Sequence, residues 1–254
     1  LVSDLQSAQS GLLFTLMGPG GSGKTSVAIE CLRRLSTFFE DRIWFVDLTA
    51  SGDAETAIRK LQSVLNIQIG EISEAIPTII RTLRGEPCLL VLDNFEQLMP
   101  DSAEWIAKLT HGAPNCHLLI TSRIALNLAN ERRIFIGSLD LPNTFMTLAE
   151  IRNCAAVQLY EREGQAANPR FSVTPDNALS VVELCNRLDG LPLALELAAA
   201  RLTTFSSSEI LSNIERSMDF LLSTREGISP RHSSLARTID WSYNLLSPDL
   251  QNTV

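Results

Sequence analysis

The residues most suited to chemistry lie in a glycine-rich stretch near the N-terminus. This stretch fits the pattern G-x-x-x-x-G-K-[ST] at every fixed position. Its residues are Gly18, Pro19, Gly20, Gly21, Ser22, Gly23, Lys24 and Thr25. Glycines allow backbone conformations in which successive N–H groups point inward around an anion, and a helix that begins near Lys24 adds the positive end of its dipole. Lys24 would then reach the β- and γ-phosphates of a nucleotide, and the Thr25 hydroxyl would hold Mg²⁺.

A flexible Gly/Ser turn in front of a helix is the alternative. The flanking residues favour phosphate binding, because an apolar run at 12–17 precedes the stretch as a buried strand would. Apolar residues at helical spacing follow it, which completes the strand–loop–helix context that this motif requires. We therefore expect residues 18–25, together with Ser26 on the first turn of the helix, to bind a nucleoside di- or triphosphate.

A carboxylate follows a second apolar run, Cys88–Leu92. Asp93 stands where P-loop enzymes place the second residue that holds Mg²⁺, although an aspartate followed by Asn94 is also typical of a turn or helix cap. Many hydrolytic relatives of such enzymes carry an acid at the position of Asn94, and asparagine is a poor base. Glu96 lies nearby, but the sequence does not say where its side chain points. We therefore expect slow hydrolysis, with the nucleotide mainly setting a conformational equilibrium.

Two further residues are candidates for nucleotide contacts. Arg123 follows the apolar run at 118–121, and parallel strands end at the ligand-binding edge of a sheet. An arginine placed there can pair with a γ-phosphate and respond to its loss, but a solvated surface arginine explains the residue equally well. Pro192, in Gly190-Leu191-Pro192, indicates by its type only the start of a helix.

The order of the apolar runs predicts the fold. Apolar strands alternate with helical segments up to Leu141-Pro142, which predicts an α/β fold with a parallel sheet covered by helices on both faces. A helix is also predicted at 73–83, although Pro77 opposes it unless the proline lies in its first turn. After residue 142 we expect an all-α bundle of about four helices. The predicted domains are a nucleotide-binding domain at 1–142, a helical bundle at 143–226 and the beginning of a further unit at 227–254.

Several start signals divide the predicted bundle. A capping box at Thr147 predicts a helix through about Glu163, and Thr174-Pro175 predicts the start of another. The segment 193–202 is apolar nearly all round, as a buried helix would be. A second capping box, at 206–209, opens the next helix.

Composition limits the possible function classes. The chain has 254 residues and a net charge of −8, which argues against a general nucleic-acid binder with a basic face. No apolar run approaches the roughly 18 residues that span a bilayer, and no secretory signal opens the chain, so we expect a cytoplasmic protein without membrane contact. Five widely spaced cysteines predict buried free thiols in a reducing compartment. Because the chain begins at Leu1 and stops shortly after a helix-start signal at Ser247-Pro248, we expect a piece of a longer protein.

Taken together, these segments resemble the STAND class of signal-transduction ATPases, in particular the NB-ARC-like (AP-ATPase-like) module of bacterial transcriptional regulators. Five segments occur in the order of the family along nearly the whole chain. Those at 188–202 and 231–248 are much more specific than a phosphate loop alone. The matching segments are GPGGSGKT at 18–25, LLVLDNFEQL at 89–98, LLITSR at 118–123, LDGLPLALELAAARL at 188–202 and RHSSLARTIDWSYNLLSP at 231–248.

The resemblance implies an adenine nucleotide, ATP or ADP, with Mg²⁺. It implies that the strand ending at Thr121 lies between the phosphate-loop strand and the Asp93 strand, and that Arg123 senses the γ-phosphate beside Lys24. Pro192 would touch the adenine or ribose, and a winged-helix domain would begin in the region after residue 226. In this class ADP holds a closed, inactive form, and exchange for ATP opens the protein and usually permits self-association. Effector and sensor domains are then expected on the same longer chain.

Two departures from the family pattern concern the base and the closed form. The h-h-G-R-E segment, which helps to bind adenine, is not found in residues 1–11, and most of the winged helix, with its histidine to the β-phosphate, is missing.

Two other functions also remain open from the residues. One is a metabolic or motor P-loop enzyme with fast turnover, although no L-S-G-G-Q-like transporter signature is present and the negative charge disfavours a helicase. The other is a nucleotide-bound scaffold that does not switch.

Overall fold

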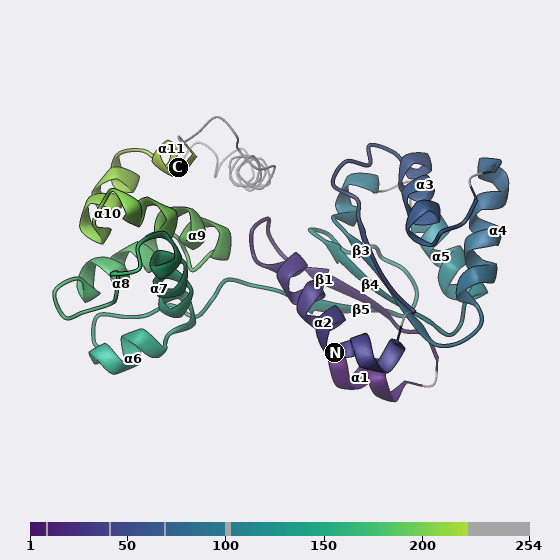
Figure 1. The fold of residues 1–254 in the computed structure, drawn as a ribbon, viewed down its shortest axis with the longest axis horizontal. Coiled ribbons are helices and arrows are strands. Elements are labelled where there is room, and N and C mark those ends of the chain that lie inside the picture. Colours follow the sequence, from purple (N-terminus) through teal and green to yellow (C-terminus); the bar gives the residue numbers. More distant parts are fainter. Residues whose placement is uncertain (9, 41, 69, 100–102, 223–254) are drawn as a thin grey trace. The chain divides into compact units, whose positions relative to one another are not determined.

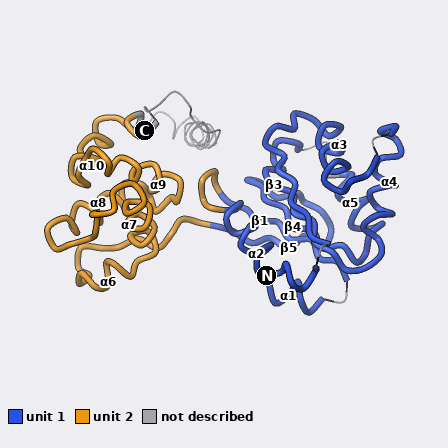
Figure 2. Tube along the Cα trace, in the orientation of Figure 1, with its two compact units in different colours: residues 1–18, 24–136 blue, residues 19–23, 137–254 orange. Residues whose placement is uncertain are grey.

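The computed structural model describes residues 1–222 except 9, 41, 69 and 100–102. Two compact units are present (Figure 2): residues 1–18 with 24–136, and residues 19–23 with the described residues from 137 onward. The predicted domain boundaries, 1–142, 143–226 and 227–254, stay predictions. The expected start of a winged helix and the helix signal at Ser247 lie outside the described residues.

The first unit is built on a five-stranded parallel sheet (Figure 1) with the order β2-β3-β4-β1-β5. This confirms the predicted α/β fold, including the position of β4 between β1 and β3. The strands are β1 (Leu13–Met17), β2 (Ile43–Asp47), β3 (Cys88–Asp93), β4 (Cys116–Ser122) and β5 (Glu131–Phe135).

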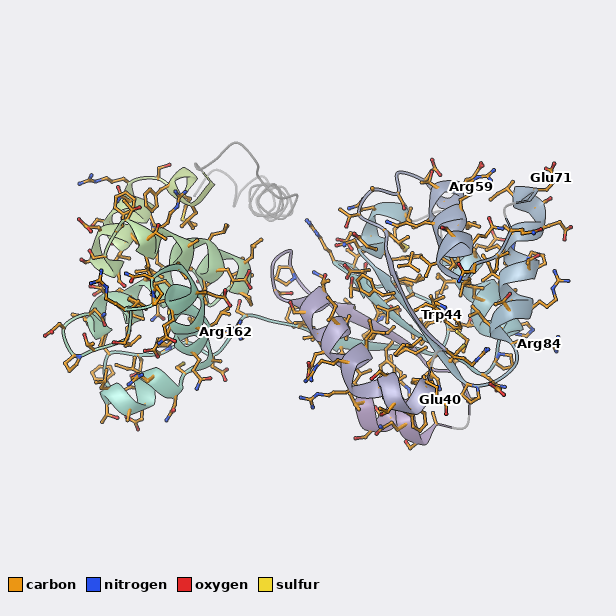
Figure 3. All side chains as sticks on the ribbon, viewed as in Figure 1. Glu40, Trp44, Arg59, Glu71, Arg84 and Arg162 are labelled. Atoms are coloured by element: carbon orange, nitrogen blue, oxygen red, sulfur yellow. The ribbon has the colours of Figure 1, made fainter. Side chains whose placement is uncertain are left out.

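Helices cover both faces of this sheet. They are α1 (Val2–Ser7), α2 (Lys24–Phe39), α3 (Ala54–Val64), α4 (Ile72–Leu83) and α5 (Ala103–Gly112). A short 3-10 helix, η1 (Phe95–Leu98), follows β3. The charged side chains of Arg59, on α3, and of Glu71 and Arg84, at the two ends of α4, lie on the surface of this unit (Figure 3).

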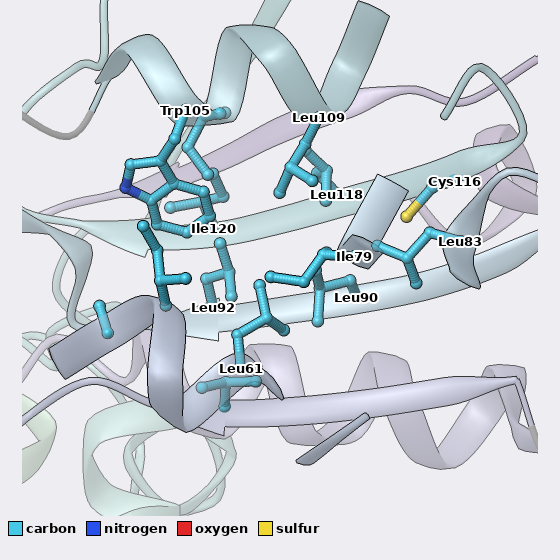
Figure 4. Close-up of a cluster of buried hydrophobic side chains, with 14 of the residues drawn as sticks. Leu61, Ile79, Leu83, Leu90, Leu92, Trp105, Leu109, Cys116, Leu118 and Ile120 are labelled. Atoms are coloured by element: carbon cyan, nitrogen blue, oxygen red, sulfur yellow. The ribbon is translucent and has the colours of Figure 1, made fainter. Parts of the chain in front are cut away.

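Successive residues of the central strands point to opposite faces, so each face has its own core. Leu90 and Leu92 of β3 pack with side chains of α3, α4 and α5 (Figure 4). Leu89 and Val91, one residue out of phase, pack on the other face with α1 and α2. A strand that is buried on both faces reads as a continuous apolar run, which is why β3 is recognisable in the sequence.

The helix α4 continues through Pro77, which lies beyond its first turn. The proline removes one backbone donor. The apolar face formed by Ala75, Ile79 and Leu83 is nevertheless fully packed against the core, and tertiary packing outweighs the local preference.

The described part of the second unit consists of helices. It contains six α-helices, where about four were predicted. They are α6 (Leu148–Asn153), α7 (Ala155–Ala167), α8 (Ala178–Arg187), α9 (Pro192–Ala200), α10 (Ser207–Arg216) and α11 (Asp219–Leu222), with a 3-10 turn, η2 (Arg201–Thr203), after α9. Within the described residues no helix has the length and apolar character needed to cross a membrane.

Two predicted helices of this unit were wrong in part. The helix expected from Thr147 to Glu163 is two helices, because Cys154 is extended (φ −72°, ψ 134°) and its thiol donates to the Asp140 carbonyl. The helix expected to begin at Thr174-Pro175 begins at Ala178, because residues 174–177 close a turn whose carbonyl at Thr174 accepts from the Ala178 N–H. Both capping boxes, at Thr147 and Ser206, are formed as predicted.

Candidate phosphate-binding site

The phosphate loop connects β1 to α2. Gly18, Gly21 and Gly23 have φ angles of 155°, 77° and 93°, which residues other than glycine rarely adopt. Lys24, the first residue of α2, is buried, and its Nζ donates to the Gly18 carbonyl at 2.9 Å. Burial lowers the pKa of the Lys24 ammonium. The lysine is therefore folded back over the loop, as a phosphate-binding lysine would be.

Residues 19–23 of the loop belong with the second unit, where they meet the start of α9. The Leu193 N–H donates to the Gly21 carbonyl at 3.2 Å. A Cβ placed on Gly21 would lie 2.8 Å from the Leu193 Cβ, and one on Gly23 would lie 4.0 Å from Cγ of Pro192. Pro192 thus lies beside residues 19–23, whereas its residue type alone indicated only a helix start. Its contact with adenine or ribose stays a prediction.

Asp93 ends β3 and is nearly fully buried, with 2% of its surface exposed. The Thr25 hydroxyl lies within hydrogen-bonding distance of both carboxylate oxygens, at 2.9 and 3.0 Å, and the Thr121 hydroxyl donates to Oδ1 at 2.5 Å. Burial raises the pKa of the Asp93 carboxyl, while the two hydroxyl donors lower it and the charges of Asp47 and Glu96 raise it further. The carboxylate is therefore fixed next to the hydroxyl expected to share its metal.

Asn94 is held in the left-handed conformation, with φ 63° and ψ 43°. Its N–H donates to the Thr121 hydroxyl at 2.9 Å, and its side-chain amide donates to Asp93 Oδ2 at 2.9 Å and to the Thr49 hydroxyl at 2.8 Å. Asparagine tolerates this conformation better than most residues. The side chain is thus a structural donor that braces Asp93.

Thr121 and Thr49 also belong to this network, and neither was predicted from the sequence. Thr121 could have been found, because it lies near the end of an apolar strand that the family resemblance places beside the Asp93 strand. Thr49 lies after β2 and carried no comparable signal. Ser26 is exposed on the first turn of α2.

Arg123 follows β4 and is mostly buried, with 20% of its side chain exposed. Its Nε donates to Glu96 Oε1 at 3.1 Å, and the Glu96 side chain is 16% exposed. Arg123 is therefore not a solvated surface residue. Its role toward a γ-phosphate stays a prediction.

The residues present fit a nucleotide with Mg²⁺. The Ser22 hydroxyl of the loop is buried and has no hydrogen-bond partner among the described residues, so it is available to a phosphate oxygen. The Thr25 hydroxyl and the Asp93 carboxylate are the oxygen ligands that Mg²⁺ prefers. A bound Mg²⁺ would neutralise charge on the phosphates.

Relatives of the chain include regulators. Over 235 residues the chain is 31% identical to an uncharacterised protein of Mycobacterium tuberculosis, covering 92% of this chain and 57% of that protein. It is 33% identical over 239 residues to a candidate HTH-type transcriptional regulator of the same organism, covering 92% of this chain and 25% of the regulator. The chain therefore spans little more than half of the first relative and a quarter of the second.

A solved structure shares the fold. A chain from the structure of Drosophila ORC bound to DNA superposes with a TM-score of 0.57 at 12% identity, covering 91% of this chain and 67% of that one. A family model described as an AAA domain matches residues 7–153, which include the loop, Asp93 and Arg123. Because this match covers more than half of the chain, the chain belongs to the AAA domain family of P-loop NTPases, whose members bind a nucleotide, generally with Mg²⁺.

Proposed function

We propose that this chain is the ATP- and ADP-binding switch module of a larger signalling or transcription-regulating protein. The observation that carries the proposal is the buried Asp93 carboxylate, held against the Thr25 hydroxyl directly after the phosphate loop. A buried carboxylate braced by hydroxyl and amide donors is an oxygen site ready for Mg²⁺. The resemblance to STAND-class modules and the regulator among the relatives support the switch role.

Each predicted residue has a distinct task in this proposal. The backbone of residues 18–25 and Lys24 would bind the phosphates, and Thr25 with Asp93 would hold Mg²⁺. Arg123 would pair with the γ-phosphate, and Pro192 would touch the adenine or ribose. Ser26 would support the phosphate end of the site from the first turn of α2.

We expect hydrolysis to be slow. An amide is too weak a base to take a proton from water, and the Asn94 amide nitrogen already donates to Asp93 and to Thr49. Each nucleotide would then act mainly because it binds one of two conformations more tightly than the other. ADP would favour a closed form and ATP an open one. Such opening would permit self-association.

The proposed partners lie on the same longer protein. The chain spans 57% of one relative and 25% of the regulator, which leaves room in such proteins for effector and sensor domains. With a net charge of −8 we expect no direct nucleic-acid binding by this chain, and we expect the protein to act in the cytoplasm.

The switch is tested by comparing the full chain in ADP and in a non-hydrolysable ATP analogue, each with Mg²⁺. Small-angle scattering reports opening, and light scattering after gel filtration reports self-association. We expect both to change between the two nucleotides, and the change to vanish in Lys24→Ala but not in Lys108→Ala, an exposed lysine on α5.

Other outcomes point to the alternatives. Identical size and mass in both nucleotides, with binding intact, would indicate a non-switching scaffold. Turnover of many ATP molecules per second would indicate a fast metabolic or motor enzyme.

A further inference from the structure

Glu96 is directed toward the site by the turn that follows β3. The left-handed Asn94 redirects the chain into η1, which carries Glu96. The Glu96 carboxylate accepts from Arg123 Nε at 3.1 Å, although 27 residues separate the two in sequence. This ion pair is mostly buried, so it is less screened by solvent than a surface pair.

The second oxygen of this carboxylate, Glu96 Oε2, is buried and has no donor to pair with among the described residues. A buried acceptor without a donor is costly. The carboxylate is thus held in place by its charge rather than by a complete set of hydrogen bonds.

Glu96 also acts on Lys24 through its charge. Its negative charge acts on the pKa of the Lys24 ammonium more strongly than that of Asp93, opposing the lowering caused by burial. The same carboxylate therefore interacts with both cations, Lys24 and Arg123, to which the proposed function gives the γ-phosphate.

We propose that Glu96 is an internal competitor of the γ-phosphate, which occupies Arg123 when no γ-phosphate is bound and so favours ADP over ATP. The inference rests on the proposed function, because it concerns the same site. A guanidinium binds carboxylate and phosphate oxygens with the same donors. In this role Arg123 turns from Glu96 to the γ-phosphate when ATP binds, and ATP also places the charge of the γ-phosphate near that of Glu96, where like charges repel.

The test is the substitution Glu96→Gln, which keeps the shape of the side chain and removes its charge. In the full chain we expect the affinity for a non-hydrolysable ATP analogue, measured by calorimetry with Mg²⁺, to rise about tenfold. We expect the affinity for ADP to change by less than about twofold, because ADP has no γ-phosphate to compete. The readout is a ratio of two affinities, so it does not depend on hydrolysis.

Two comparisons isolate the competition. In an Arg123→Ala background, Glu96→Gln should raise the analogue affinity much less, because the contested cation is gone. Glu55→Gln removes the same charge from another Arg–Glu pair, on α3 with Arg59 (Figure 3), and it should leave the ratio of affinities unchanged.

Opposite results separate this inference from the proposed function. If the unaltered chain binds both nucleotides and Glu96→Gln leaves their ratio unchanged, the competitor role is wrong and nucleotide binding stands. If the unaltered chain binds neither, the proposed function fails and this inference with it. Should Glu96→Gln not fold, Glu96→Asp draws the carboxylate back from Arg123, and an unchanged ratio in that variant also overturns the inference.

Discussion

The hydroxyl of Thr25 lies 2.9 and 3.0 Å from the two carboxylate oxygens of Asp93, across a sequence separation of 68 residues. Thr25 lies on the first turn of α2, and Asp93 ends β3, two positions from β1 in the sheet. The parallel order brings the ends of these strands to one edge, as expected for an open α/β sheet. The pair joins the phosphate loop to the strand expected to supply its second metal ligand.

Asp93→Asn should stabilise the nucleotide-free chain at pH 7 while weakening its nucleotide binding. Burial disfavours the ionised carboxylate, so a neutral side chain of equal size should raise the free energy of unfolding. Mg²⁺-dependent nucleotide affinity should fall at least about tenfold, because a carboxylate ligand is lost. Urea unfolding and calorimetry measure the two effects, and a variant that is destabilised would contradict the electrostatic account.

The stabilisation should depend on pH with a definite sign. The pKa of Asp93 is raised above 3.8 in the folded chain, so ionisation of the folded state costs stability as the pH rises through that pKa. The advantage of Asp93→Asn should therefore be largest at pH 7 and shrink as the pH falls toward 3.8. Asp53, the N-cap of α3, has a lowered pKa because Thr56 donates to it. Asp53→Asn should accordingly show no such gain at pH 7.

Ser206→Ala tests the capping box that opens α10. The Ser206 hydroxyl accepts from the Glu209 N–H, and the Glu209 carboxylate accepts from the Ser206 N–H at 2.8 Å. Loss of such a cap costs about 1 kcal/mol, which thermal or urea unfolding of the second unit would show. Ser212→Ala, at an exposed position later in the same helix, should cost less than about 0.5 kcal/mol, and equal costs for both would contradict the capping role.

Gly190→Ala should destabilise the turn that precedes α9. Gly190 has φ 62°, its carbonyl accepts from the Leu139 N–H at 3.0 Å, and an added Cβ would lie 2.5 Å from the Leu139 carbonyl oxygen. The strain and the close contact together should cost more than about 1 kcal/mol. At Gly52 a Cβ would meet nothing within 4 Å, so Gly52→Ala serves as the control in the same unfolding measurement. A Gly190→Ala chain as stable as the control would contradict the backbone argument.

The parts of the fold predicted from sequence are those set by local pattern. Leu89 to Leu92 alternate between two buried faces, so β3 is apolar throughout and recognisable without tertiary information. The capping box at Ser206 is likewise complete within four residues. The phosphate loop is also local, because its glycines and Lys24 are neighbours in the chain.

The parts that could not be predicted depend on distant partners. The break at Cys154 is fixed by the Asp140 carbonyl, 14 residues away, and no local signal such as proline or glycine marks it. The direction of Glu96 depends on the left-handed Asn94 and on Arg123. Thr121 likewise becomes a partner of Asp93 only through the pairing of β3 with β4.

Direct measurement of nucleotide binding tests the central claim that residues 18–25 hold a nucleotide with Mg²⁺. Calorimetric titration of the full chain with ADP, with and without Mg²⁺, should show binding that is stronger in the presence of the metal. Lys24→Ala should weaken it about 10- to 100-fold, because a hydrogen bond to a charged group is lost, whereas Lys108→Ala should leave it unchanged. Binding that is absent in the unaltered chain, or equally strong after Lys24→Ala, would contradict the claim.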